Sequence, residues 1–294
     1  MIFSKKDGMI DTRPTAASWP KRIFELSDVP ERFLPALRPW LDRGLEPAQM
    51  IFVPRVQHWL TVIPESLLFR FEQEVVFVER GGEDVLVIEQ KDVLVVRHYM
   101  ELLKCQMSIL YRQDGEIRRK SLSYSRMSDD LMVEIYNTLL GNPPEYAPNL
   151  FLHDNTACER LFTESYMMYN FGKLCYRLSD HVESFFWQRR KKQGLSKFMK
   201  SKADPENLVV CMTDGISMVN ADFYGFEAVH LPWKSVQDVS FAEAEDKAPA
   251  VLSIQTAAKR CYTIPIEPGR EDEAQRFQLF IRRYRDESVD LSVS

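Results

Sequence analysis

The chain has 294 residues, of which 45% are hydrophobic and 28% charged, with a formal net charge of −5 and a pI near 5.7. This length provides for two domains, because a typical domain runs to about 100–200 residues. The acidic balance argues against a protein built to bind a polyanion, so we expect no nucleic-acid partner and confine any basic function to a local patch.

The N-terminal stretch "MIFSKKDGMIDTRP" lacks the apolar run of about 7–15 residues that a signal peptide needs, and no segment reaches the ~18 apolar residues of a membrane span. The cysteines are odd in number, widely spaced and set among apolar residues, which is typical of reduced structural thiols. They are Cys105, Cys158, Cys175, Cys211 and Cys261. We therefore expect a soluble, cytoplasmic protein without disulfides.

Residues 1–49 are predicted to form an N-terminal helical arm. In "SDVPERFLPALRPWLDRG", apolar residues recur at helical spacing between a cap at Asp28 and a stop at Gly44. Pro35 and Pro39 lie inside this stretch, so they must kink the helix or break it into two turns.

Residues 50–141 change to short β-rich runs followed by one helix. The runs are "MIFV", "SLLFRF", "EVVFVE", "DVLVIE", "DVLVVRHY", "QMSILYR" and "RKSLSYS". Turn residues such as Asp114-Gly115 separate them, and an amphipathic segment beginning near Ser128 ends at Gly141. This pattern predicts a meandering antiparallel sheet closed by a C-terminal helix.

Residues 142–202 are predicted to be a linker and a helical connector. The prolines of "NPPEYAP" forbid regular structure, and a helix is expected from Thr156 to about Gln193. Its apolar face would hold Leu178, Val182, Phe185, Phe186 and Trp187, buried against a sheet or, as the alternative, placed in an interface.

Residues 203–294 repeat the strand-rich pattern and again end in a helix, which follows Gly269. The runs are "NLVVCMT", "GISMVN", "EAVHLPW", "VQDVSF", "AVLSIQT" and "RCYTIPIE". In both halves two alternating strands with a short polar turn precede a terminal amphipathic helix at similar spacing, which favours an internal duplication.

Two stretches of the second half carry a family resemblance. "VVCMTDGISMVN" is similar to the opening hairpin of the pleckstrin-homology-like family, and "LPWKSVQDVSF" is similar to its strand of the form Pro, aromatic, two residues, aliphatic, two residues, aliphatic. With "DVLVIEQKDVLVV" in the first half, the chain resembles a tandem of such domains, particularly prokaryotic ones, over residues 50–141 and 203–287. The resemblance implies an α+β fold of two bent antiparallel barrels or sandwiches, each closed by a C-terminal helix.

The family mostly binds lipids, peptides or proteins without catalysis, and its phosphoinositide-binding members grip the headgroup with Lys and Arg on and between the first two strands. Residues 203–233 contain no Lys or Arg but several acidic residues, so phosphates there would meet net negative charge. The resemblance therefore favours recognition of a protein or peptide over phosphoinositide binding.

The sequence contains no clear catalytic or metal-binding motif. None of the five histidines lies in a recognised nucleophile motif, Gly-x-Ser-x-Gly is absent, and no phosphate-cradling loop occurs. A metal set drawn from His153, Asp154, Cys158, Cys175 and His181 has the wrong spacing, and no Cys-x-x-Cys pair exists. We predict a protein that is not an enzyme and has no cofactor and no metal.

Two basic clusters are the candidate anion contacts. Arg118, Arg119 and Lys120 begin a predicted strand, where protection of a sheet edge is the alternative role. The second cluster consists of Arg189, Arg190, Lys191, Lys192, Lys197, Lys200 and Lys202. Its first four charges suit the last turn of a helix that stops at Gly194, and the others form a short basic tail.

The function predicted from the sequence is an intracellular binding or scaffolding module for a protein or peptide partner. Peripheral binding to an anionic membrane through residues 189–202 is one alternative, because each basic residue near such a surface contributes about 1 kcal/mol. An enzyme with a site between domains is the other. The oligomeric state is left open.

Overall fold

The computed structural model describes residues 19–58, 61–147, 155–189, 205–222, 224–244 and 249–291. Within these ranges the sheets are mostly antiparallel and are accompanied by a few helices, so the predicted α+β class is confirmed. The sheets are open, and the predicted closure into barrels is not found among the described strands. No helix in these ranges is both long enough and apolar enough to span a membrane.

The chain forms two compact units that are discontinuous in sequence. The first comprises Met1–Lys91, Leu103–Cys105 and Leu122–Glu145. The second comprises Asp92–Leu102, Gln106–Ser121 and Tyr146–Ser294. The predicted domains were continuous, so their limits differ from those of the units.

The first unit is built on a five-stranded sheet in the order β1-β2-β5-β6-β7. Its strands are β1 (Lys21–Arg22), β2 (Met50–Val53), β5 (Ser66–Phe71), β6 (Glu74–Glu79) and β7 (Asp84–Glu89). A small hairpin of β3 (Val56–His58) and β4 (Thr61–Ile63) lies between β2 and β5 in sequence. The runs predicted for β2 and β5–β7 are confirmed at these residues.

The predicted N-terminal arm is helical, although it begins later than expected. Two short 3₁₀ turns (Leu26–Asp28 and Glu31–Phe33) lead into α1 (Leu34–Leu41), which contains Pro39. The carboxylate of Asp28 accepts from the backbone N–H of Glu25 at 3.2 Å, so it caps the first of these turns instead of α1. Trp40 packs edge-on against Phe69 of β5, with ring centroids 5.4 Å apart.

Helix α2 (Val133–Leu140) lies on β5 and β6 and ends at Gly141, whose φ of 85° is left-handed. Glu134 accepts from Arg22 of β1 at 2.5 Å and from Arg70 of β5 at 3.0 Å. Burial tends to raise the pKa of Glu134, but the hydrogen bonds and charges of both arginines outweigh it and leave that pKa below its usual value. A paired carboxylate therefore ties α2 to the sheet.

The second unit contains most of a seven-stranded sheet in the order β10-β9-β8-β14-β13-β12-β11. Its strands are β8 (Val93–Glu101), β9 (Lys104–Gln113), β10 (Glu116–Ser125), β11 (Val182–Arg189), β12 (Glu206–Met212), β13 (Gly215–Ala221) and β14 (Gly225–Pro232). Strands from both halves of the sequence meet where β8 pairs with β14. A side chain at Gly225 would collide with the carbonyl of Met100, so the close approach there requires glycine.

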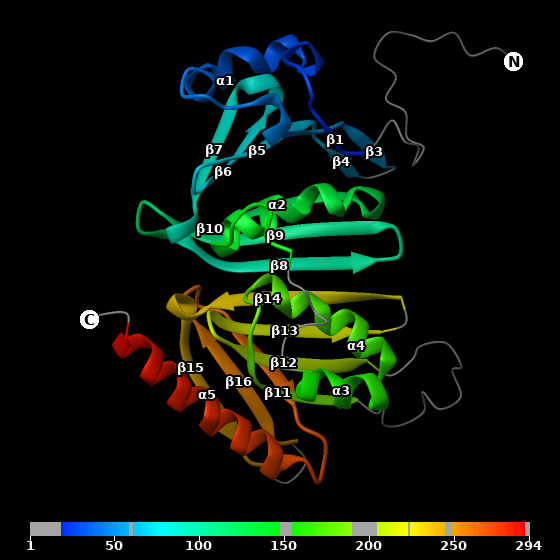
Figure 1. Ribbon diagram of the computed structural model, residues 1–294, viewed down its shortest axis with the longest axis vertical. Helices are drawn as coiled ribbons and strands as arrows, with labels where there is room; N and C mark the ends of the chain where they lie inside the picture. Colours follow the sequence, from blue (N-terminus) through cyan, green and yellow to red (C-terminus); the bar gives the residue numbers. More distant parts are fainter. Residues whose placement is uncertain are drawn as a thin grey trace, which may run out of the picture. The chain divides into compact units, whose positions relative to one another are not determined.

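One face of this sheet packs on a three-stranded sheet and the C-terminal helix. The elements are β15 (Val236–Ala242), β16 (Val251–Thr256), β17 (Cys261–Pro265) and α5 (Glu271–Leu291). Helix α5 runs along β15 (Figure 1) and brings Phe277 within 6.1 Å of the ring of Phe186 on β11. The resulting core also contains Val209, Ile254 and Ile281.

The predicted long helix of the connector is correct only in its first part. Helices α3 (Asn155–Glu164) and α4 (Tyr166–Gly172) and a 3₁₀ turn, η9 (Lys173–Arg177), confirm it up to residue 177. Residues 182–189 are the strand β11, so the helix predicted over these residues is wrong, and Arg189 is not in the last turn of a helix. The remaining part of the predicted helix end, residues 190–193, lies outside the described residues. Both faces of this strand are covered, so its residues are apolar on both sides. The spacing of apolar residues in such a run does not distinguish a strand from a helix.

Several other predictions are settled by the structure. Strands β12–β17 and helix α5 lie where their runs predicted, and the order β9, β10, α2 matches the order β16, β17, α5. Common ancestry of the halves stays a prediction. Cys105, Cys175 and Cys211 are buried and form no disulfide, whereas Cys261 is exposed, contrary to expectation.

The placement of β11 is tested by truncating Phe186, which is fully buried. Phe186→Ala should lower the free energy of unfolding by about 3–5 kcal/mol, because it removes a ring from the centre of the core. Leu279→Ala, at a residue of α5 that is 57% exposed, should change it by less than about 0.5 kcal/mol. Urea denaturation of both variants measures these values, and equal small losses would contradict the assignment.

Candidate functional site

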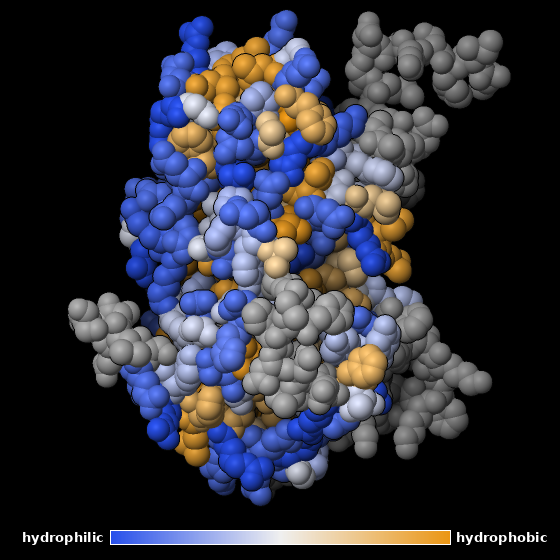
Figure 2. All heavy atoms as spheres, viewed as in Figure 1, coloured by the Kyte–Doolittle hydropathy of each residue, from blue (hydrophilic) through white to orange (hydrophobic). Residues whose placement is uncertain are grey.

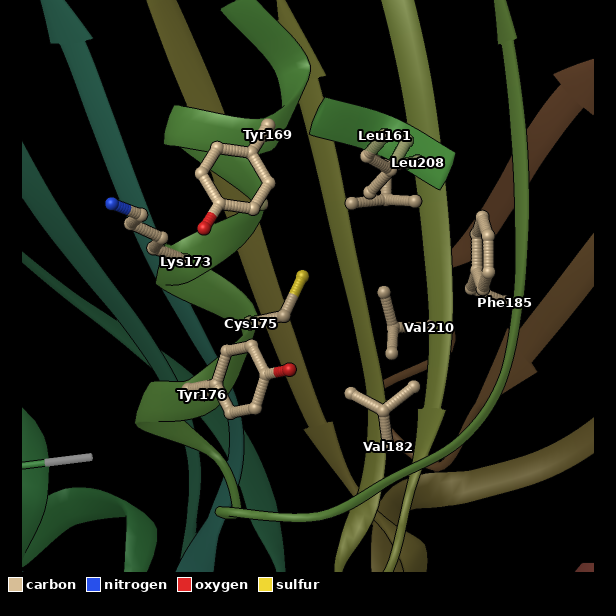
Figure 3. A pocket seen from close by; sticks show the side chains of 10 residues that line it. Leu161, Tyr169, Lys173, Cys175, Tyr176, Val182, Phe185, Leu208 and Val210 are labelled. Carbon is tan, nitrogen blue, oxygen red and sulfur yellow. The ribbon is translucent and has the colours of Figure 1, made fainter. Parts of the chain in front are cut away.

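The candidate site is a pocket on the other face of β11 and β12. Helix α4 packs on β12 and β13, and α3 packs on β11. The pocket has an empty volume of about 440 Å³, a value that includes space open to solvent. Figure 3 shows the helical segment on one side of it and the two strands on the other.

The strand side of the pocket is apolar because of strand register. Phe185 lies opposite Val210 in the pairing of β11 with β12, and both side chains line the pocket together with Leu208 and Val182. The intervening residue Val209 faces the core on the opposite side. Alternation thus gives these strands two apolar faces, and the second requires a cover.

The helical side combines apolar and polar groups. It contributes Leu161, Tyr169, Gly172, Lys173, Cys175 and Tyr176. The thiol of Cys175 and the hydroxyl of Tyr176 point from η9 into the pocket, whereas the ammonium of Lys173 points away from its centre (Figure 3). Lys173 Nζ lies 5.1 Å from the centroid of the Tyr169 ring, so it forms a cation–π contact.

The helices beside the pocket carry an aromatic cluster, which we call the aromatic triad: Phe162, Tyr166 and the partly buried Tyr169. Phe162 is 55% exposed and Tyr166 65%. The ring of Phe162 meets those of Tyr166 and Tyr169 edge-on at 5.9 and 5.2 Å. Figure 2 shows a small hydrophobic patch at the position of α3 and α4, and Tyr169 links the triad to the pocket wall.

The same sheet face becomes polar toward its middle. In the pairing of β12, β13, β14 and β8, one row runs from Val210 through Ser217 and His230 to Val96. His98 lies on this face of β8, and Arg177 of η9 donates from Nη1 to its Nδ1 at 2.8 Å. Since a guanidinium only donates, the proton of a neutral His98 ring lies on Nε2.

Ser217 and His230 have the separation of a nucleophile and its base, with Oγ and Nδ1 2.9 Å apart. Yet Ser217 Oγ also donates to the carbonyl of Cys175 at 3.3 Å, so His230 Nδ1 must donate to the hydroxyl. Both side chains are fully buried, and His230 Nε2 has no hydrogen-bond partner within the described chain. This pair holds η9 on the sheet and is not arranged to activate the serine.

Burial lowers the pKa of His230 to about 3, and the nearby charge of Arg177 acts in the same direction. A protonated ring would add an unpaired N–H and a second cation next to the guanidinium. His230 is therefore neutral whenever the protein is folded near neutral pH.

The candidates from the sequence lie apart from this pocket. Arg189 donates from Nε to Glu206 at 3.1 Å and from Nη2 to the carbonyl of Glu164 at 3.2 Å, so its charge has a structural partner. The other members of that cluster lie outside the described residues: Arg190, Lys191, Lys192, Lys197, Lys200 and Lys202.

The cluster at residues 118–120 lies on β10, an edge strand of the seven-stranded sheet. Arg118 donates to Gln113 and Asp114, and Arg119 donates to Ser108 and Ser121. Charged side chains on such a strand suit protection of the edge, and a role in anion binding stays a prediction.

Sequence reasoning missed the pocket because helix and strand residues meet there only through tertiary packing. One signal was present: Phe162, Tyr166 and Tyr169 follow spacings of four and three, which place them on one side of a helical segment. Neither the comparison with protein-family models nor the search of curated proteins found a match to this chain.

The pH dependence of stability tests the His230 network. The folded pKa of about 3 lies below the unfolded value of 6.5, so this contribution to stability is complete above about pH 6.5 and falls as the pH is lowered toward 3. Between about pH 7 and pH 5 the loss should be about 2 kcal/mol, at 1.4 kcal/mol per pH unit below 6.5.

His230→Asn should remove that part of the slope, whereas His181→Asn, at a half-exposed histidine, should keep it. Urea denaturation at both pH values measures the slopes. Identical slopes for the wild type and His230→Asn would contradict the assignment of a buried neutral histidine.

Proposed function

We propose that this chain is a non-catalytic binding protein built from two pleckstrin-homology-like modules, and that it recognises a protein or peptide at the pocket and the aromatic triad. Strand order supports the modules. Four meandering strands, three further strands and one helix occur twice: β2 and β5–β7, β8–β10 and α2, then β11–β14, β15–β17 and α5. The second module would begin at Val182 instead of residue 203.

A fold of this kind does not by itself choose a ligand, so the proposal rests on the surface. Two sheet edges at which a peptide strand might add are already used. Strand β8 would be an edge strand in an isolated first module, but here it pairs with β14. On β15, the carbonyls of Gln237 and Val239 accept from Arg285 and Gln278 of α5. Strand addition at these two positions is thereby disfavoured.

The observation that carries the proposal is the aromatic triad beside an apolar pocket. Large exposed aromatic side chains that adjoin a hydrophobic pocket are typical of interaction sites, where Tyr, Trp and Arg supply most of the binding energy. The triad also lies on a segment that already covers the sheet, so its exposed rings are not needed to bury that face.

The alternatives draw less support from these side chains. Arg189, the described member of the basic segment, is engaged by Glu206. The described residues that line the pocket include no histidine or carboxylate beside the Cys175 thiol, and a cysteine nucleophile needs such a base.

Selection from a random peptide display library, with the full chain immobilised, tests the proposal. Enriched peptides should bind the Phe162→Ala/Tyr166→Ala double variant at least about tenfold more weakly, because truncating exposed aromatic anchors removes contact area. Leu279→Ala, which removes an exposed side chain on α5, is the matched control and should bind as the wild type does.

Circular dichroism and urea denaturation should show the double variant folded, since both rings are more than half exposed. Failure to enrich any peptide would overturn the proposal. Salt-sensitive cosedimentation with anionic vesicles in that case would favour the membrane alternative.

A further inference from the structure

We infer that strand β7 of the first unit is a second binding site, where an extended peptide with an aliphatic centre and a basic residue at each end adds to the edge of the sheet. This inference goes beyond the proposed function and does not depend on the pocket or the aromatic triad. It follows from the open edge of β7, its lack of protection, the charges at its ends and a strand pairing in the second unit.

Strand β7 is the last strand of the five-stranded sheet, and no other described strand pairs with its outer side (Figure 1). Its pairing with β6 continues without a bulge from Asp84 to Glu89. Backbone N–H and C=O groups alternate between the two sides of a strand, so some of those on β7 point outward, where a further strand can pair with them.

The centre of β7 lacks the features that protect a sheet edge. The four residues between Asp84 and Glu89 are aliphatic and include no charge, proline or glycine, and Val85 is 43% exposed. Other described edge strands are protected or short. Strand β10 carries two arginines and a lysine, β15 has an irregular register and is bonded by α5, and β1 has two residues. An unprotected aliphatic edge favours strand addition.

Carboxylates flank this aliphatic centre at both ends. In the pairing of β6 with β7, Glu79 lies opposite Asp84. At the other end, Glu74 lies opposite Glu89. Like charges that face each other across a strand pair destabilise it, whereas opposite charges stabilise it. A basic residue at each end of an added strand would therefore meet two carboxylates.

Two nearby cations offset only part of this negative charge. Arg80 pairs with Asp84 at 3.1 Å, and Lys91 pairs with Glu89 at 2.5 Å. Over residues 74–92, however, six acidic residues outnumber these two basic ones. The charge of this edge thus favours a basic partner strand and disfavours an acidic one.

The fold already uses strand addition at the corresponding position of the second half. Strand β7 is the last of four meandering strands, as β14 is in the second half. The outer side of β14 pairs with β8 in antiparallel register, from Gly225 opposite Glu101 to His230 opposite Val96. A peptide strand on β7 would repeat this arrangement.

A second copy of the chain fits this edge less well than a basic peptide. Two β7 strands in a symmetric antiparallel register would place Asp84 of one copy opposite Glu89 of the other, so that carboxylates would meet at both ends. We therefore commit to an extended segment of a different protein.

Amide hydrogen exchange, followed by NMR on the full chain, tests the inference. The probe is the acetylated, amidated peptide Lys-Val-Thr-Thr-Val-Lys, whose sequence reads the same in both directions and so fits either strand orientation. Its addition should slow the exchange of outward-pointing amides of β7 and leave the amides of β10 unchanged. A counterpart with proline in place of both threonines loses an N–H that faces β7 in any register, so it should bind at least about tenfold more weakly.

Charge preference is measured with a second counterpart that carries glutamate in place of both lysines. It should bind the wild type about tenfold more weakly than the lysine peptide, because attraction at each end becomes repulsion. In the Asp84→Asn/Glu89→Gln variant this difference should fall to about threefold or less, since half of the flanking carboxylates are gone.

Val85→Lys separates strand addition from folding. It places a protecting charge on the edge at a half-exposed position, so it should weaken binding of the lysine peptide at least about tenfold and leave the midpoint of urea denaturation nearly unchanged. Val85→Thr keeps a β-branched side chain without a charge, and as the matched control it should bind within about twofold of the wild type.

The possible failures are distinguishable. If the lysine peptide does not slow exchange in β7, or if Val85→Lys binds it as the wild type does, the inference is overturned. If sedimentation shows a dimer that Val85→Lys dissociates, the edge belongs to a second copy and the peptide is excluded. Slow exchange of the outward amides in a free monomer would assign the edge to another segment of the same chain. None of these results affects the proposed function, which is tested by peptides that the Phe162→Ala/Tyr166→Ala variant binds more weakly.

Discussion

The rest of the second unit depends on one constraint, the two apolar faces of β11 and β12. A strand buried on one side alternates apolar and polar residues, but these strands present Phe186 and Val209 to one side and Phe185 and Val210 to the other. The first pair is covered by β15–β17 and α5 and the second by α3, α4 and η9. Without the second cover, apolar strand surface would face water, where it would destabilise the fold and invite aggregation.

The same constraint explains why the pocket exists. The cover is a helical segment of three short pieces, and toward the strands it presents a glycine and a cysteine as well as larger side chains. The small residues Gly172 and Cys175 leave space at this contact, and the rings of Tyr169 and Tyr176 form part of the wall around it. A binding site at this position is thus a consequence of how the face is covered, and it needs no dedicated loop.

The sequence predicted most of the fold because most strands are half-buried or bounded by clear turns. The run 66–71 alternates between a face packed on α1 and a face near α2, and the hairpin at Asp114-Gly115 has positive φ at both residues, as its type demands. The helix after Gly269 was recognisable from its acidic first turn. For these elements the local sequence pattern was sufficient to predict the structure.

At β11 the local sequence pattern predicted the wrong structure, because tertiary packing determines the structure of this segment. Leu178, Val182, Phe185 and Phe186 fit a helical stripe, and only the pairing with β12 shows that Phe185 and Phe186 face opposite ways. The pocket was hidden for the same reason. Lys173 and Val210 are 37 residues apart in sequence and come together because η9 crosses the sheet. The aromatic triad was visible as a spacing, but its exposure was not.

The polar part of this face fixes the geometry that the apolar part leaves loose. Apolar packing is non-directional, so the contacts of α4 with β12 do not by themselves set the position of η9 along the strands. The hydrogen bonds from Arg177 to His98 and from Ser217 to the carbonyl of Cys175 do set it. The second of these holds the backbone of the residue whose thiol points into the pocket. Burying two histidines costs stability, and in return the wall of the pocket has one defined position, so folding and recognition depend on the same few polar groups.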